Sequence, residues 1–193
     1  SSPGLLSIEV ELPADPDISL VRAREDLILA ARDISGAVAD TPANTKVVVR
    51  LVSDDSALGH EGYRLSGGVS GATIEANTAI GAMYGLYHIA GDIGARYIHP
   101  EQSVFPSNSE VTLPDYGEAT NHRPHYALRG FHEHTQHPTV MSDYLLRADE
   151  DGFREGVSNY VRWLARNRQN RLTFHMLNTV NLDTWVPYMT DIT

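Results

Sequence analysis

The sequence predicts an α/β sandwich, with a small mixed or antiparallel sheet and two helices, followed by the first strand-helix-strand unit of a second domain. Three observations predict this fold class. Runs with the period of strands are interleaved with two helical stripes in residues 1–100. A passage rich in Pro, Ser, Asn and Asp follows in residues 101–124. A strand, an amphipathic helix and another strand then succeed one another in residues 125–177.

The first three elements are read from apolar spacing. Residues 5–12 alternate apolar and acidic side chains, as a half-buried strand does. Residues 19–39 carry apolar side chains at helical spacing, with Asp17 or Ser19 as the N-cap. Residues 46–52 (KVVVRLV) form a short β-branched run that is consistent with a central strand.

A hairpin and a second helix complete the first domain. Residues 61–76 alternate on both sides of a glycine-rich connection, which predicts the hairpin. Thr78 can cap the helix that follows. Gly81 and Gly85 lie four residues apart on this helix, where each costs about 1 kcal/mol relative to alanine. We therefore expect the helix backbone to lie close to the sheet, and the domain to end near Pro100.

The second domain is expected over residues 125–193. One strand is predicted within the preceding passage, at residues 110–113. Residues 125–134 and 170–177 are then predicted as strands on either side of an amphipathic helix at residues 153–167. Strand, helix and strand in this order indicate a βαβ unit with parallel strands.

Composition excludes several classes of function. The 193 residues carry a net charge of −10, and basic residues do not cluster, so no nucleic-acid partner is expected. The absence of cysteine excludes disulfides, thiolate zinc sites and a cysteine nucleophile. No apolar run approaches the roughly 20 residues that a membrane-spanning helix needs, so no membrane partner is expected either.

Several segments resemble a known group of enzymes. EGYRLS (residues 61–66) and TIEANTAIGAMYGLYHIAGDIGARYIHP (73–100) are similar to the N-terminal domain that precedes the barrel in β-N-acetylhexosaminidases. Related glycosidases such as α-glucuronidases carry a similar domain. ALRGF (127–131) and YVRWLARNRQN (160–170) resemble the first strand and helix of the catalytic barrel. The resemblance covers most of residues 46–178.

The resemblance implies a domain layout and a function. Residues 1–100 would form the accessory domain, 101–124 a linker, and 125–193 the beginning of a (β/α)₈ TIM barrel, about two of its eight units. The chain would be the N-terminal portion of a glycoside hydrolase acting on a polysaccharide or glycoconjugate, exported to the periplasm or the extracellular space. The paired catalytic carboxylates of hexosaminidases lie on the fourth strand, so we expect neither catalytic residues nor turnover within these 193 residues.

Arg129 is the first candidate ligand for a carbohydrate substrate. The resemblance implies that it hydrogen-bonds sugar hydroxyls from the end of the first strand, and a guanidinium offers several fixed donors for this purpose. A structural salt bridge is the alternative. The pattern departs from hexosaminidases at His134, where they tend to have aspartate, and at Asn178, where their second strand ends in aspartate. These departures leave a more distant, α-glucuronidase-like glycosidase open.

Histidine and tryptophan side chains complete the expected site. His132 and His134 would point the same way on a strand, where they could line a polar cleft or ligate a metal. Trp185, in the loop after the second strand, could stack on a sugar, whereas Trp163 is expected to pack. We expect neither a metal nor a cofactor. The expected substrate-binding set is Arg129, His132, His134, His175 and Trp185.

Two further functions stay open. A noncatalytic carbohydrate-binding or assembly module would need a ligand site within residues 1–100, where no aromatic platform is evident. A metal-dependent hydrolase would use His132 and His134, although the spacing does not match the HExxH motif of zinc proteases. An incomplete barrel would also leave strand edges and apolar faces uncovered, so we expect a homo-oligomer or a rearranged barrel segment.

Overall fold

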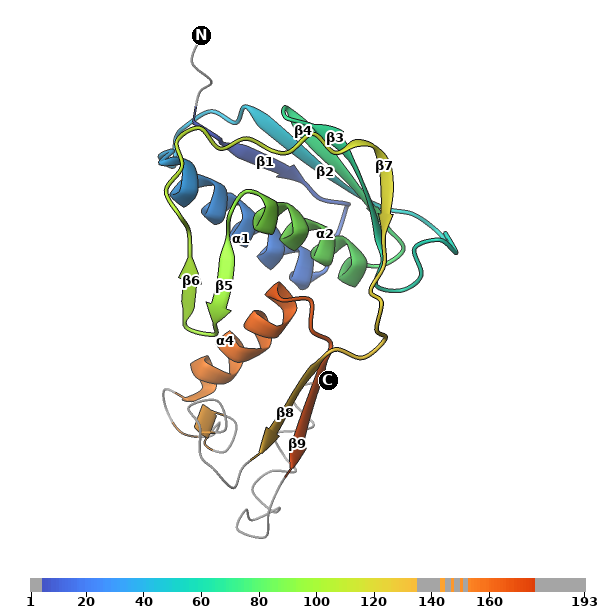
Figure 1. Cartoon of the computed structure of the whole chain (residues 1–193), viewed down its shortest axis with the longest axis vertical. Coiled ribbons are helices and arrows are strands. Elements are labelled where there is room, and N and C mark those ends of the chain that lie inside the picture. The colour runs from blue at the N-terminus through green and yellow to red at the C-terminus, as the bar shows by residue number, and fades with distance from the viewer. Residues whose placement is uncertain (1–4, 135–142, 145–146, 148–149, 151–152, 176–193) are drawn as a thin grey trace.

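The computed structural model of the chain describes residues 5–134, 143–144, 147, 150 and 153–175. Figure 1 shows a sheet with two helices against one face, and a smaller unit of one helix and two strands beyond those helices. The main hydrophobic core lies between the sheet and the two helices. The predicted α/β sandwich is therefore present in the first domain.

A five-stranded mixed sheet forms the outer layer of this domain, in the order β1-β2-β4-β3-β7. β1, β2 and β4 run parallel, whereas β3 pairs antiparallel with both β4 and β7. The hairpin predicted from the glycine-rich connection is β3 and β4. The bounds are β1 Ile8–Glu11, β2 Thr45–Leu51, β3 Tyr63–Gly68, β4 Gly71–Ala76 and β7 Gly117–His122.

Two capped helices, α1 (Ile18–Ser35) and α2 (Ala79–Asp92), cover the inner face of the sheet. Asp17 rather than Ser19 caps α1, because its carboxylate accepts the backbone N–H of the latter at 2.8 Å. The hydroxyl of Thr78 caps α2 in the same way. Of the helices that the structure describes, none is both long and apolar enough to cross a membrane.

The glycines of α2 allow the helix to approach the sheet closely. A Cβ atom added at Gly85 would lie 2.7 Å from Cγ2 of Ile74 in β4. One added at Gly81 would lie 2.4 Å from the carbonyl oxygen of Gly62. The close approach predicted from the two glycines is therefore confirmed.

The passage after Pro100 contains more structure than the sequence indicated. β6 (Gln102–Val104) pairs with β5 (Arg96–His99), and β7 completes the main sheet. The strand predicted at residues 110–113 is wrong, because these residues form a turn and an irregular segment. Val111 and Leu113 are nevertheless buried in the core, which explains the apolar spacing that suggested a strand.

The second unit consists of β8 (Gly130–His134), α4 (Phe153–Arg166) and β9 (Arg171–His175). β8 and β9 are parallel, with their first residues in register and their last residues in register. Tyr160 and Leu164 of α4 are the buried residues of this unit's own small core. The predicted βαβ order is confirmed by the parallel pairing.

Candidate functional site

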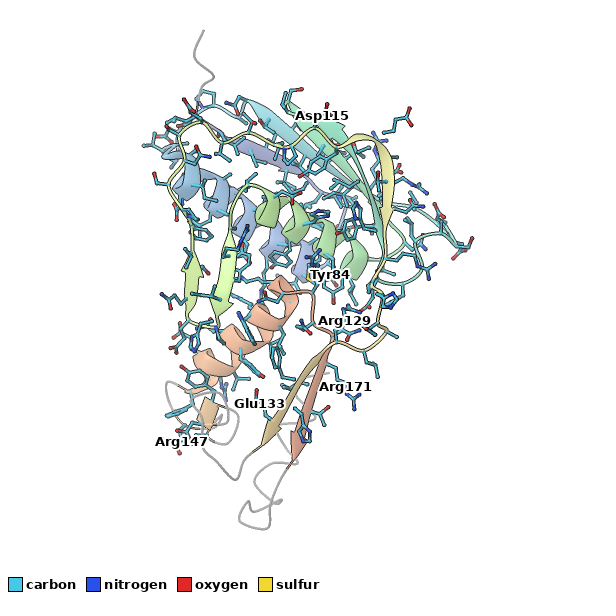
Figure 2. The ribbon with its side chains drawn as sticks, in the orientation of Figure 1. Tyr84, Asp115, Arg129, Glu133, Arg147 and Arg171 are labelled. Atoms are coloured by element: carbon cyan, nitrogen blue, oxygen red, sulfur yellow. The ribbon has the colours of Figure 1, made fainter. Side chains whose placement is uncertain are left out.

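A cleft of about 430 Å³ lies where the first domain meets the second unit. Its walls come from the start of β3, from α2, from the chain after β7, and from the turn after α4. Figure 2 shows Tyr84 and Arg129 facing each other at this junction. The charged and aromatic residues of the lining include Glu61, Tyr63, Tyr84, Arg123, Arg129 and Arg168.

Arg129 ties several segments of the chain together in one wall of this cleft. Its Nη1 donates to the Glu61 carboxylate at 3.0 Å and to the carbonyl of Tyr126 at 2.7 Å. Its Nε donates to the carbonyl of Arg168 at 2.9 Å. The guanidinium also lies 5.7 Å from the ring centre of Tyr84. Only 16% of the side chain is exposed, so this is an internal ion pair.

The position of Arg129 differs from the prediction. The sequence suggested the carboxyl end of the first barrel strand, where barrel ligands bind. β8 begins only at Gly130, so Arg129 stands at the amino end of the strand. The contacts observed are those of the alternative, a structural salt bridge with Glu61. A role of Arg129 in binding sugar hydroxyls stays a prediction.

Glu61 and Asn170 are essential to this junction, and sequence reasoning missed both. Asn170 donates to Glu61 at 2.9 Å and to the carbonyl of Ala127 at 2.8 Å, and it accepts the backbone N–H of Arg129 at 2.8 Å. The amino ends of β8 and β9 are thereby held together against the first domain. Asn170 closes the WLARNRQN phrase, but no local pattern marks Glu61.

A second ion pair joins α4 to the first domain. Arg166 donates to both carboxylate oxygens of Asp26 at 2.8 and 2.6 Å, and each side chain is 15% exposed. Tyr87 donates its hydroxyl to the same carboxylate at 2.9 Å. Burial, with Asp26 beside it, raises the pKa of Tyr87. Trp163 donates to the carbonyl of Tyr97 at 2.8 Å, which confirms its predicted packing role.

A polar network extends from the cleft into the first domain. His88 accepts the Tyr63 hydroxyl at 2.8 Å on Nδ1 and approaches Asp92 at 3.3 Å with Nε2, so the neutral ring carries its proton on Nε2. The Tyr63 ring stacks on His122 with centroids 5.1 Å apart. Burial lowers the pKa of His88, and the charge on Arg168 adds to this effect while Asp92 opposes it. Burial likewise lowers the pKa of His122.

The histidines expected to bind substrate lie on the strands of the second unit. His132 is exposed on β8. His134 and His175 are register partners at the carboxyl ends of β8 and β9, but their side chains lie outside the described part of the structure. Trp185 lies outside the described residues altogether. Binding of a sugar by these four residues stays a prediction.

The metal alternative receives no support from the part of the chain that is described. Within residues 5–134 and the described positions after them, no three His, Cys, Asp or Glu side chains are grouped to hold a metal ion. The pair that this alternative requires includes His134, whose side chain lies outside that part.

The arrangement of the first domain matches a known family. Residues 5–90 match the model of glycosyl hydrolase family 20, domain 2. We refer to the domain that contains these residues as the family 20 domain, after this match. The match confirms the resemblance inferred from the sequence to the N-terminal accessory domain of glycoside hydrolases of the hexosaminidase type. No curated protein matches the chain.

Solved enzymes share the fold of the family 20 domain and of the unit that follows it. The β-hexosaminidase of Streptomyces plicatus, solved with the product GlcNAc, is 20% identical, with a TM-score of 0.53 over 86% of this chain and 30% of the enzyme. The β-N-acetylhexosaminidase of Streptomyces coelicolor is 22% identical, with a TM-score of 0.54 over 88% of this chain and 30% of the enzyme.

A more distant enzyme gives a similar result. A family GH138 enzyme targeting pectin rhamnogalacturonan II is 15% identical, with a TM-score of 0.57 over 93% of this chain and 22% of the enzyme. At such identities the likeness shows the fold alone. The chain spans less than a third of the length of these three enzymes.

Proposed function

We propose that the chain is the N-terminal part of a glycoside hydrolase, in which the family 20 domain supports the first βαβ unit of a (β/α)₈ catalytic barrel. The observation that carries this proposal is the parallel pairing of β8 and β9, joined by α4 and attached to the family 20 domain. A parallel pair with a helical crossover is the repeating unit of such a barrel.

The direction of the strands supports the placement of a sugar site. Figure 1 shows β8 and β9 running away from the family 20 domain. Barrel enzymes bind their ligands at the carboxyl ends of the strands. We therefore propose that the substrate, a polysaccharide or glycoconjugate, binds at the ends distant from the family 20 domain, where His132, His134 and His175 lie on the strands. Stacking of Trp185 on the sugar stays part of this proposal.

Exposed apolar side chains support the proposal that further strands cover this unit. Large apolar side chains on or beside it are 44–68% exposed: Tyr126, Leu128, Phe131 and Val161. Two strands and one helix leave such faces open, and the rest of a barrel would bury them. In the isolated 193-residue chain, a second copy would cover them instead.

Burial of these apolar side chains by a second copy predicts that the isolated chain associates. We expect light scattering to give a mass above that of one 21.3 kDa chain at micromolar concentration. Phe131→Ser together with Val161→Ser should shift the mass towards the monomer. A clean monomer for the unsubstituted chain would contradict the covering by a second copy.

Most glycosidases use a pair of acidic side chains to cleave the glycosidic bond, and we propose that the catalytic acids lie outside these 193 residues. The test compares the 193-residue chain with the product of the complete reading frame, on aryl N-acetyl-β-hexosaminides and aryl glucuronides. We expect turnover from the complete product alone. Turnover by the short chain that is lost on changing one of its own acids would overturn the proposal.

We also propose export from the cell, which fractionation of the producing organism would test.

A further inference from the structure

The cleft at the junction is lined by more arginine side chains than carboxylates. Arg123, Arg129 and Arg168 line it, against a single carboxylate from Glu61. Glu61 is already engaged by Arg129 and Asn170. With the residues that the structure describes, neither Arg123 nor Arg168 forms an ion pair. Both residues are exposed, so the lining carries two solvated guanidinium groups that no carboxylate of the described residues engages.

Arg168 occupies a backbone conformation that favours glycine. Its φ is 58°, in the left-handed region. Its N–H donates to the carbonyl of Ala165 at 2.9 Å, and the N–H of Gln169 donates to that of Leu164 at 2.8 Å. This is the Schellman motif that ends many helices, in which glycine is the usual residue here. Arginine is less favourable than glycine at this position, so the backbone conformation does not explain why arginine is present.

The side chain of Arg168 acts inside the cleft. Burial raises the pKa of the Tyr63 hydroxyl, and the guanidinium of Arg168 opposes that shift by its charge and by a hydrogen bond. The same charge contributes to the lowered pKa of His88 and His122. The strained residue thus brings its positive charge to the polar wall of the cleft.

Arg123 and Arg129 also line the cleft. A Cβ at Gly59 would lie 3.2 Å from Nη2 of Arg123, and one at Gly62 would lie 3.0 Å from its Cγ, so glycine leaves room for this side chain. Nη2 of Arg129 is buried without a hydrogen-bond partner in the described part of the chain. Because Nη2 has almost no exposed surface, Arg129 forms part of the cleft wall, and Arg123 and Arg168 are the guanidinium groups left to contact a ligand.

We propose that this cleft binds a molecule of monosaccharide size carrying a carboxylate, phosphate or sulfate group, with Arg123 and Arg168 as the ligands of that group. The cleft volume of about 430 Å³ falls in the range of small-molecule sites. Guanidinium groups bind such oxyanions through paired N–H donors. Because Arg123 follows β7 and Arg168 follows α4, the ligand bridges the family 20 domain and the second unit.

This site is separate from the proposed sugar-hydrolysis site, because it lies at the amino ends of β8 and β9. Its test is therefore a binding measurement that does not depend on turnover. Thermal unfolding of the full chain is followed with glucuronate, glucose 6-phosphate and inorganic phosphate, with neutral glucose as the control. A ligand that binds the cleft should raise the Tm by roughly 5–10 °C when its free concentration is about a hundred times its Kd.

The arms of this experiment distinguish the source of the oxyanion. A shift with glucuronate or glucose 6-phosphate alone identifies a charged sugar, and an equal shift with inorganic phosphate identifies the anion itself. No shift with any oxyanion, or an equal shift with glucose, overturns the proposal.

Arg168→Gly provides the sharpest variant. Without ligand it should unfold at the same temperature as the parent chain or higher, because glycine relieves the left-handed strain. Its affinity for the oxyanion should fall at least about tenfold, as for loss of one charge-assisted contact. A lower melting temperature without ligand would show that Arg168 serves stability, and would overturn the assignment.

Two further variants guard against indirect effects. Arg123→Gln should weaken binding by a similar factor, since it removes the other guanidinium that has no carboxylate partner. Arg22→Gln makes the same charge change at an exposed site on α1, and should leave affinity unchanged. Unchanged binding in both Arg123→Gln and Arg168→Gly would overturn the proposal.

Discussion

The Tyr63, His88 and Asp92 side chains form a line of polar contacts between the sheet and α2. His88 has its ring nitrogens occupied by the Tyr63 hydroxyl and the Asp92 carboxylate, and Tyr116 donates to the same carboxylate at 3.1 Å. Burial keeps the pKa of His88 below its ordinary value. The folded protein therefore holds a histidine that resists protonation.

This network predicts a loss of stability in mild acid. The unfolded chain takes up a proton on histidine as the pH falls through about 6.5, whereas folded His88 and His122 stay neutral to lower pH. The free energy of unfolding should therefore fall between about pH 7.5 and 5.5 and be fully present above that window. Urea midpoints at the two pH values measure the slope.

His88→Gln should flatten this slope, because the variant no longer has the group whose protonation differs between the two states. His60→Gln, at an exposed position, serves as the control. An unchanged slope in His88→Gln would assign the acid sensitivity to other groups.

Helix α2 depends on glycine where it crosses the sheet. Gly81→Ala places a methyl group 2.4 Å from the backbone oxygen of Gly62, which cannot turn aside as a side chain could. We expect a loss of about 1–3 kcal/mol in the free energy of unfolding, despite the better helix propensity of alanine. Gly91→Ala, with no heavy atom near the added Cβ, should gain up to about 1 kcal/mol. Urea unfolding of both variants compares the two effects, and equal effects would contradict the close approach.

The helices and strands differ in how well their sequences predict them. β3 and β4 were predictable because buried side chains alternate along them. α2 is buried on nearly all sides, so its Thr78 cap was a better signal than any period. β7, with the sequence GEATNH, is an edge strand that is almost fully exposed, so it shows no apolar alternation. Its pairing with β3 is set by neighbours distant in the sequence.

The candidate site was predictable only in part. Arg129 was recognisable, but ALRGF has a strand-like pattern throughout, and only from Gly130 does the chain pair with β9. A Cβ atom at Gly130 would clash with the carbonyl oxygen of Arg171. Glycine therefore fits where the pairing of β8 with β9 begins. The contact between Glu61 and Asn170 joins residues 109 positions apart, which no local period can reveal.

The whole molecule is held together by two ion pairs across the junction, Glu61 with Arg129 and Asp26 with Arg166. Arg166 also lies 4.9 Å from the ring centre of Tyr97. Both pairs are largely shielded from solvent, so removing one partner leaves an uncompensated charge and costs more than breaking a surface pair. They fix the second unit on the family 20 domain.

Breaking the second pair should loosen this attachment. Arg166→Gln leaves the Asp26 carboxylate without its cation, and we expect a loss of about 3 kcal/mol in the free energy of unfolding. Limited proteolysis should then cut around α4 sooner than in the parent chain. Arg147→Gln, which removes an exposed pair with Glu150, should change little in either measurement. Equal sensitivity of the two variants would contradict a fixed junction.

The attachment of β8 and β9 by their amino ends has a consequence for biosynthesis. Domains form in the order in which the ribosome releases them, so the five-stranded sheet and its helices can be complete before α4 emerges. Asp26 and Glu61 are then already in their folded positions. Their partners Arg129, Arg166 and Asn170 are synthesised later and can bind to them directly. The family 20 domain would thus act as a template during translation, setting the orientation of β8 and β9 as they are made.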